Sequence, residues 1–310
     1  MADRGVVAFV GLGNMGFPMV SRLVAAGFEV HGFDVSPDAI ERLAGIGATG
    51  YPTAAAAAEG ASVVVLMLPN SAIVQSVVDD LVAADAVSGR IIVDMSSSEP
   101  LATRALAVSL GEAGAALIDA PVSGGVTGAV KGTLTIMVGG DEDAFQTVLP
   151  VLSELGRPIR TGEAGSGHAI KALNNLLSAT HLMATSEAME AGVAFGLDPE
   201  VMLAVFNTSS GRSGSTENKW PNFVLPGSYD SGFGLALMLK DMKIAVGLAD
   251  STSAPHALSS HAVDLWSAAS SALPAKADHT EVARWVAAAG SDDRSGSAAP
   301  NPITGVESDA

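Results

Sequence analysis

The chain has 310 residues, of which 48% are hydrophobic, and its 16 basic and 33 acidic residues give a formal net charge of −17. This composition can build two hydrophobic cores, and the negative charge disfavours nucleic acid and anionic lipid as partners. The absence of cysteine excludes disulfides, thiolate catalysis and sulfur-ligated metals, and it fits a cytoplasmic location. No apolar stretch reaches the ~18 residues of a membrane span, so we expect no membrane association and no export signal.

The first half of the chain alternates short apolar runs with segments of helical periodicity. The apolar runs cover residues 6–10, 29–34, 62–68, 90–95, 116–121 and 133–139. Between them, stretches such as 14–27 and 36–47 have apolar residues three and four apart and end in glycine. The alternation predicts an α/β domain with a parallel sheet over residues 1–164.

From about residue 165 the strand signals stop and helical patterns follow. We predict a long helix from Gly165 to Phe195 and further helices within 197–207, 232–251 and 255–273. Residues 165–290 therefore form an all-helical second domain, joined to the first by the long helix. The segment 291–310 lacks aromatic residues and is rich in Ser, Gly and Pro, so we expect it to be disordered.

A glycine-rich segment directly follows the first apolar run and opens a helical stretch. In that context G-x-G-x-x-G is typical of dinucleotide binding. Gly11 permits a tight turn, Gly13 lets the backbone approach a pyrophosphate, and Gly16 allows close helix packing. We assign the whole segment to the cofactor phosphates: Gly11, Leu12, Gly13, Asn14, Met15 and Gly16.

Asp34 ends the second apolar run, where a carboxylate can accept hydrogen bonds from the adenosine ribose hydroxyls. An NADP site needs a cation beside the 2'-phosphate, yet residues 35–37 are uncharged and the next basic residue, Arg42, lies in the following helix. The pattern favours NAD. The alternative is a structural glycine turn with an ordinary exposed Asp34.

Lys171 is the only fully charged residue in the segment 164–186, which lies between Glu163 and Glu187. On a helix, Gly167, Lys171, Asn174, Asn175 and Ser178 share one face. A lysine in such apolar surroundings needs polar partners, and burial lowers its pKa toward working pH, so it can act as an acid/base group. Alternatively the lysine snorkels to water.

Further polar groups could complete a site. Residues Asp119–Gly125 follow a strand, and Ser123, Gly124 and Gly125 can direct hydroxyl and backbone N–H donors at a carboxylate. The charged pair Lys240–Asp241 interrupts an apolar helical run, where a core-facing helix would not need charges. The alternative is that the two residues form a solvent-exposed ion pair.

Three more residues are of types that can bind an anion or a metal. Arg212 either meets a second anion or caps a helix, and His168 and His181 read as ordinary helix residues without a third metal ligand nearby.

Four motifs in order, VAFVGLGNMGFPM, DAPVSGG, GHAIKALNN and LMLKDMKIA, resemble those of the β-hydroxyacid dehydrogenase family, typified by 3-hydroxyisobutyrate dehydrogenase. The match runs from residue 5 to about 289. The resemblance implies a Rossmann domain, an all-helical domain and an NAD cofactor between them. It implies that Lys171 is the catalytic acid/base, helped by Asn175. It assigns substrate binding to Asn174, Ser123, Gly124 and Gly125, and further cofactor contacts to Leu68, Pro69, Ser97 and Lys240.

The expected activity is therefore NAD-dependent, metal-free oxidation of a small 3-hydroxy acid similar to 3-hydroxyisobutyrate, by a homodimer or homotetramer. One alternative is reduction of tartronate semialdehyde, a sulfo-semialdehyde or another aldehyde acid by the same family. A less favoured alternative is a non-catalytic dinucleotide-binding sensor. Lys171 argues against the related imine reductases, and the chain is too short for the helical domain of 6-phosphogluconate dehydrogenase.

Overall fold

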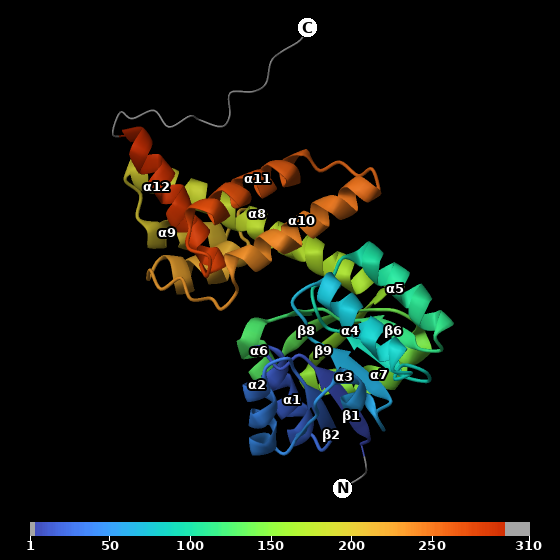
Figure 1. Cartoon of the computed structure of the whole chain (residues 1–310). Coiled ribbons are helices and arrows are strands. Elements are labelled where there is room, and N and C mark those ends of the chain that lie inside the picture. Colours follow the sequence, from blue (N-terminus) through green and yellow to red (C-terminus); the bar gives the residue numbers. More distant parts are fainter. Residues whose placement is uncertain (1–3, 295–310) are drawn as a thin grey trace. The chain divides into compact units, whose positions relative to one another are not determined.

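The computed structural model describes residues 4–294, and the chain divides into two compact units between Asn174 and Asn175. This division falls inside the long helix α8 (Ser166–Phe195), whose predicted extent is confirmed to within one residue. The elements of each unit are labelled in Figure 1.

The first unit is built on a nine-stranded sheet with the order β3-β2-β1-β4-β5-β6-β8-β7 and with β9 paired to β8. Strands β3, β2, β1, β4, β5 and β6 are parallel, whereas β8 runs antiparallel to β6 and β7. The order 3-2-1-4-5-6 is that of the Rossmann fold, so the predicted fold class is confirmed. The strands are β1 (Val6–Val10), β2 (Glu29–Phe33), β3 (Thr49–Gly50), β4 (Val63–Leu66), β5 (Ile91–Asp94), β6 (Ala116–Asp119), β7 (Val122–Ser123), β8 (Leu134–Gly139) and β9 (Gly156–Gly162).

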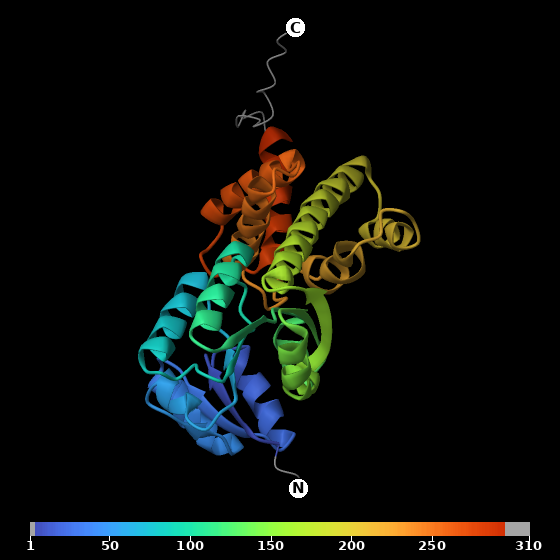
Figure 2. The ribbon, with the colours of Figure 1, turned by 90° about the vertical axis from the view of Figure 1, so that its right-hand side faces the viewer.

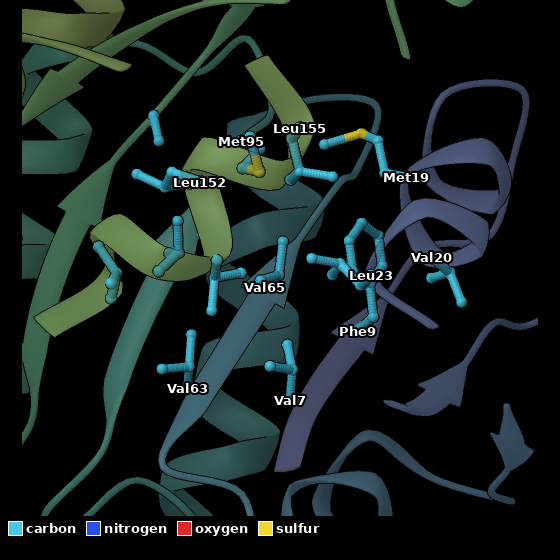
Figure 3. Close-up of a cluster of buried hydrophobic side chains, with 14 of the residues drawn as sticks. Val7, Phe9, Met19, Val20, Leu23, Val63, Val65, Met95, Leu152 and Leu155 are labelled. Carbon is cyan, nitrogen blue, oxygen red and sulfur yellow. The ribbon is translucent and has the colours of Figure 1, made fainter. Parts of the chain in front are cut away.

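Alternating side chains along each strand place two hydrophobic cores on the two faces of this sheet. In β1, Val7 and Phe9 point to one core, and Ala8 and Val10 point to the other. Figure 3 shows the first core, where Phe9 lies among side chains from two helices and the neighbouring strands. That face is covered by α1 (Gly16–Ala25), α2 (Pro37–Glu41), η1 (Arg42–Ile46), α6 (Gly125–Lys131) and α7 (Glu142–Leu155). The other face is covered by α3 (Ala54–Ala58), α4 (Ser71–Ala83) and α5 (Pro100–Glu112).

Three strands were not predicted, and β9 shows the reason. Its residues are mostly exposed or partly exposed, it contains Pro158, and it pairs only with β8 at the sheet edge. Such a strand carries no apolar run, because it is held by backbone hydrogen bonds to its neighbour rather than by burial of both faces.

The second unit, in its described part, consists of helices. Beyond its share of α8 it contains α9 (Pro199–Asn207), the π-helix η2 (Ser215–Val224), α10 (Leu235–Ser251), α11 (Ala257–Ala272), η3 (His279–Glu281) and α12 (Val282–Arg294). Figure 2 shows α10 and α11, in orange, packed side by side. Trp266, Met242 and Met189 are fully buried in this unit. No helix in the described residues, 4–294, is long and apolar enough to span a bilayer.

Helix α12 extends to Arg294, over the first four residues of the segment expected to be disordered, 291–310. The rest of that predicted tail lies outside the described residues.

The carboxylate of Asp119 fixes the start of α8. Asp119 is fully buried at the end of β6, and it accepts hydrogen bonds from the backbone N–H of Gly165 (2.7 Å) and of His168 (2.9 Å). The first N–H groups of a helix lack partners within it, and a negative charge is favourable there. Asp119 therefore joins two of the sequence motifs, DAPVSGG and GHAIKALNN, which are 46 residues apart at this contact.

His168 is more than the ordinary helix residue expected from the sequence. Its imidazole is buried, with Nδ1 2.8 Å from the hydroxyl of Thr103 and Nε2 3.1 Å from the carbonyl oxygen of Ser96. The ring thus links the first turn of α8 to α5 and to the loop after β5.

Candidate active site

The glycine-rich loop lies at the carboxyl end of β1, where the strand order reverses between β1 and β4. Gly11 has φ +98°, and a Cβ there would collide with the carbonyl oxygen of Met67, while a Cβ on Gly16 would collide with the carbonyl oxygen of Gly11. Gly13 has open space where its Cβ would be, and no side chain caps the N-terminus of α1. The loop therefore fits a cofactor pyrophosphate approaching at Gly13.

Asp34 lies directly beside this loop. Its Oδ2 accepts the backbone N–H of Leu12 at 2.7 Å, and its Oδ1 accepts that of Ser36 at 2.8 Å. The carboxylate is thereby held at the end of β2 next to Leu12, a position that suits hydrogen bonding to a ribose.

The position of Arg42 was not foreseen. Because η1 folds back toward the sheet, the guanidinium of Arg42 lies 4.6 Å from the ring centroid of Phe17, and its Nη2 donates to the carbonyl oxygen of Leu12 at 3.4 Å. A cation therefore does lie near the glycine loop, although it is stacked on an aromatic ring.

The loops after β4 and β5 complete this end of the sheet. The backbone N–H of Leu68 donates to the hydroxyl of Ser96 at 2.9 Å, and the Leu68 side chain packs beside Gly11. Pro69 is exposed and Ser97 is partly buried. The structure thus brings Leu68 close to the glycine loop. Sequence reasoning missed Ser96, because nothing local distinguishes it within the run of serines 96–98.

Ser123, Gly124 and Gly125 form the turn between β7 and α6. Gly124 has φ +132° and Gly125 has φ +60°, both glycines are exposed, and Ser123 is partly exposed. Added Cβ atoms would meet nothing within 4 Å at Gly125. The backbone of this turn is open to a ligand, and its assignment to a substrate carboxylate stays a prediction.

The polar residues of α8 differ in burial. Lys171 is 8% exposed and Asn175 is 5% exposed, whereas Asn174 is exposed. The amide Nδ2 of Asn175 donates to Oδ2 of Asp241 at 2.6 Å, and Oδ1 of the same carboxylate lies 3.1 Å from Nζ of Lys240. Asp241 is 2% exposed, so Lys240–Asp241 is no surface ion pair.

The sequence analysis names Asp241 but gives it no role in the site. The feature that could have revealed a role is its position within the apolar run of α10, because a buried carboxylate requires a partner. The partner that it meets, Asn175, is 66 residues away in the chain.

A cavity of about 310 Å³ lies beside the loop before η2, and its lining residues include His181, Thr185, Phe206 and Arg212. Arg212 forms a 2.8 Å ion pair with Glu217, and both side chains are largely exposed. Exposed pairs of this kind contribute little to stability.

A buried histidine lies at the start of η3. Nδ1 of His279 lies 3.1 Å from the carbonyl oxygen of Phe233, which can only accept, so Nδ1 carries the proton of the neutral ring. Its Nε2 is buried, and among the described residues it has no hydrogen-bond partner. Burial, followed by the nearby cation of Lys219, lowers the pKa of His279 to about 4, against the opposing effects of Asp278 and of the Phe233 carbonyl.

A glycine-rich dinucleotide loop on a Rossmann sheet, followed by a long helix with a buried lysine, defines an oxidoreductase of the nicotinamide-dependent dehydrogenase class. Two family models match the chain: "NAD binding domain of 6-phosphogluconate dehydrogenase" over residues 6–165, and "NAD-binding of NADP-dependent 3-hydroxyisobutyrate dehydrogenase" over residues 165–286.

Individual relatives agree with these matches. The chain is 40% identical to the mitochondrial 3-hydroxyisobutyrate dehydrogenase of Drosophila melanogaster over 82% of this chain and 81% of that one. It is 38% identical to the NAD-dependent L-serine dehydrogenase of Pseudomonas aeruginosa over 84% and 90%. Among solved structures, Mycobacterium tuberculosis 3-hydroxyisobutyrate dehydrogenase with L-serine superposes with a TM-score of 0.86 at 34% identity, covering 91% of this chain and 99% of that one. The chain belongs to the β-hydroxyacid dehydrogenase family.

Cofactor choice tests the placement of Asp34. A 2'-phosphate beside Asp34 would meet like charge, which at a partly buried site costs at least ~1.4 kcal/mol, so we expect NAD to be preferred over NADP by about tenfold or more in kcat/KM. Replacing Asp34→Asn together with Val35→Arg should narrow or invert that preference, because it removes the repulsion and adds a guanidinium. Steady-state kinetics with both cofactors measure the ratio.

Asp38→Asn is the matched control, because it removes an exposed carboxylate from the next helix. It should leave the ratio unchanged. Equal use of NAD and NADP by the unaltered protein would show that Asp34 does not lie at the ribose.

The buried His279 predicts a pH dependence of stability. Its pKa is about 4 in the folded state and about 6.5 in the unfolded state, so between these values only the unfolded state takes up the proton. Stability is therefore lost as the pH falls from 6.5 toward 4, by about 2 kcal/mol between pH 7 and pH 4.5. Urea unfolding at the two pH values should show that His279→Gln loses less stability on acidification than the unaltered protein.

His261→Gln, an exposed histidine on α11, supplies the comparison. It should lose as much stability on acidification as the unaltered protein. Identical losses in the His279 and His261 variants would contradict the prediction.

Proposed function

We propose that the protein oxidises the hydroxyl group of a small 3-hydroxy acid similar to 3-hydroxyisobutyrate, with NAD as the acceptor. The observation that carries the proposal is the polar face of α8, where Lys171 and Asn175 are buried in a helix that Asp119 anchors to the Rossmann sheet. Family membership supports the same activity.

The residues assigned to the cofactor have distinct tasks. Gly11–Gly16 would hold the pyrophosphate, and Asp34 would accept hydrogen bonds from the adenosine ribose. Leu68, Pro69 and Ser97 would line the remainder of the cofactor, and Lys240 would lie by its nicotinamide end. NAD, when bound, supplies the ring that accepts a hydride from the hydroxyl carbon of the substrate.

Lys171 is proposed as the acid/base. Its neutral amine takes the hydroxyl proton of the substrate during oxidation, and its ammonium returns that proton in the reverse direction. Asn175 would orient Lys171 or the substrate oxygen, and its own orientation is restricted by the hydrogen bond to Asp241. Asn174, which is exposed, is proposed to bind the substrate.

Ser123, Gly124 and Gly125 are proposed to bind the substrate carboxylate. The Ser123 hydroxyl and the open backbone of the two glycines offer hydrogen-bond donors to a carboxylate. A carboxylate held there would fix the distance of the hydroxyl carbon from the cofactor.

Two alternatives to the proposed oxidation can be distinguished from it by experiment. The protein could work as a reductase of tartronate semialdehyde, a sulfo-semialdehyde or another aldehyde acid, which uses the same residues in the reverse direction. A dinucleotide-binding sensor would need no buried lysine on α8, so it is the weaker alternative. The domain limits 1–164 and 165–290 and the cytoplasmic location also stay predictions.

The second unit is proposed to self-associate, as a homodimer or homotetramer. Apolar side chains are exposed at the end of α8 and along α9: Val193, Phe195, Leu197, Val201 and Val205. Phe195 is 85% exposed, which is unfavourable for a large aromatic side chain unless another surface covers it.

Lys171→Met tests the acid/base assignment. We expect turnover to fall by about 10²- to 10⁴-fold, because a positioned proton acceptor is lost, with NAD affinity little changed. The assay is NAD reduction over a panel of 3-hydroxy acids, with NAD binding measured separately by fluorescence titration. Lys243→Met, which removes an exposed lysine from α10, should retain normal turnover.

A Lys171 variant with a tenth of normal turnover would refute its role. No NAD reduction with any acid by the unaltered protein, with NAD binding intact, would favour the sensor.

Light scattering after size exclusion tests self-association. At micromolar concentration we expect a mass of at least twice the 31.0 kDa of one chain. Phe195→Asp with Val201→Asp should lower the mass by placing unpaired charges in an apolar interface. Val108→Asp, an exposed position on α5, should not change the mass. A 31.0 kDa particle for the unaltered protein would contradict the proposal.

A further inference from the structure

Ser96 lies in the loop after β5, and each of its polar groups has a partner within the first unit. Its backbone N–H donates to Oδ1 of Asp94 at 2.9 Å, and its hydroxyl accepts the N–H of Leu68 at 2.9 Å. Its carbonyl oxygen lies 3.1 Å from Nε2 of His168. Ser96 is 1% exposed, so these contacts are shielded from water. Ser96 thereby joins the loops after β4 and β5 to the start of α8.

The contact between Ser96 and His168 requires a proton on the ring. A carbonyl oxygen can only accept, so Nε2 of His168 carries a proton and donates it to Ser96. On the other side of the ring, Nδ1 lies 2.8 Å from the hydroxyl of Thr103 in α5. His168 is buried, and hydrogen bonds in a low-dielectric interior are costly to lose.

Two buried carboxylates lie near this ring, but neither depends on it for a hydrogen bond. Oδ2 of Asp94 is 3.7 Å from Nε2, and Oδ2 of Asp119 is 3.9 Å from Nδ1, and both distances are too long for hydrogen bonds. Asp94 accepts the N–H of Ser96 and the hydroxyl of Ser98, whereas Asp119 accepts two backbone N–H groups of α8. The two ring nitrogens are therefore used by Ser96 and Thr103.

The carbonyl of Ser96 also sets the direction of the following peptide group. The peptide bond between Ser96 and Ser97 is trans and planar, so its C=O and N–H point in opposite directions. When His168 fixes the carbonyl, it also fixes where the N–H of Ser97 points, and Ser97 is proposed to line the cofactor. The hydroxyl of Ser96 fixes the N–H of Leu68, whose side chain packs beside Gly11 of the glycine loop.

We propose that His168 is a positioning residue for NAD: through the carbonyl of Ser96 it holds the loops after β4 and β5 in the conformation that binds the cofactor. His168 stands three residues before Lys171 on α8, so these loops take their position from the same helix that carries the proposed acid/base. Asp119 fixes the backbone of the first turn, and His168 relates that turn to the cofactor loops. The inference rests on the proposed cofactor site and adds a residue that acts on it through Ser96.

Two amide variants separate the two hydrogen bonds of the ring. In His168→Gln the amide nitrogen can take the place of Nε2 and donate to Ser96, whereas the shorter side chain of His168→Asn reaches only the Thr103 side. By calorimetric titration, we expect the dissociation constant of NAD to rise about tenfold in His168→Asn, and to stay within about threefold of the unaltered value in His168→Gln.

Thr103→Val is the matched control, because it removes the other hydrogen bond of the same buried ring. It should lower the melting temperature but keep the dissociation constant of NAD within about threefold of the unaltered value. Equal weakening of NAD binding by His168→Asn and Thr103→Val would indicate a general loss of packing and would overturn the proposal.

A double-mutant cycle tests whether His168 acts through Ser96. Ser96→Ala removes the hydroxyl that holds Leu68, so it should also weaken NAD binding about tenfold. If both side chains maintain one loop conformation, Ser96→Ala combined with His168→Asn should weaken NAD binding by about tenfold in total. A loss of about a hundredfold would show that the two residues act independently, which contradicts the proposal.

Hydrogen–deuterium exchange on the unaltered protein requires no variant, so it decides the question even if His168→Asn fails to fold. NAD should slow the exchange of backbone amides in residues 94–98 and also in residues 166–171, because His168 connects these segments. Slower exchange in 94–98 without any change in 166–171 would overturn the proposal.

Gly13→Val reports on the proposed cofactor site itself. A side chain at Gly13 would occupy the open space assigned to the pyrophosphate, so NAD binding should be lost. Unchanged NAD affinity in Gly13→Val would refute that site and this inference together. Lost affinity in Gly13→Val with unchanged affinity in His168→Asn would refute this inference alone.

Discussion

The buried carboxylate of Asp119 is the contact on which the arrangement of the polar groups in α8 depends. It lies at the last residue of β6, and it accepts two backbone N–H groups from the first turn of α8. These N–H groups would otherwise be unpaired at a buried helix start, and a hydrogen bond in a low-dielectric interior is both stronger and more costly to lose. Lys171, three residues after His168, therefore takes its position relative to the strand ends of the Rossmann sheet.

Beyond this anchor, side chains on the same face of α8 are held by partners from other helices. Asn175 is bonded to Asp241 in α10, and Ser178 is bonded to Lys219 in η2. A buried polar group without a partner costs stability, so these pairs restrict the rotamers of the groups that would meet a substrate. Restricted rotamers in the free protein reduce the ordering that binding has to impose.

The strands with apolar runs could be predicted because burial on both faces of a parallel sheet leaves a continuous hydrophobic signal. The glycine loop could also be predicted from the sequence, because the turn needs glycine at Gly11 and Gly16. At both positions a Cβ would collide with backbone atoms. Edge strand β9 and helix η2 gave no such signal: the first is mostly exposed, and the second contains polar residues and Pro221. Arg42 was placed in its helix correctly, but its stacking on Phe17 depends on the path of η1.

The sequence by itself determined the fold class, the glycine loop and the presence of a lysine with two asparagines on one helix face, because periodicity and residue type are local properties. The tertiary structure decided which groups those residues meet. Asn175 and Asp241 are 66 residues apart, and Ser178 and Lys219 are 41 residues apart. No local pattern encodes such pairs, because they form only when helices distant in the chain pack against α8 and bury their polar groups together.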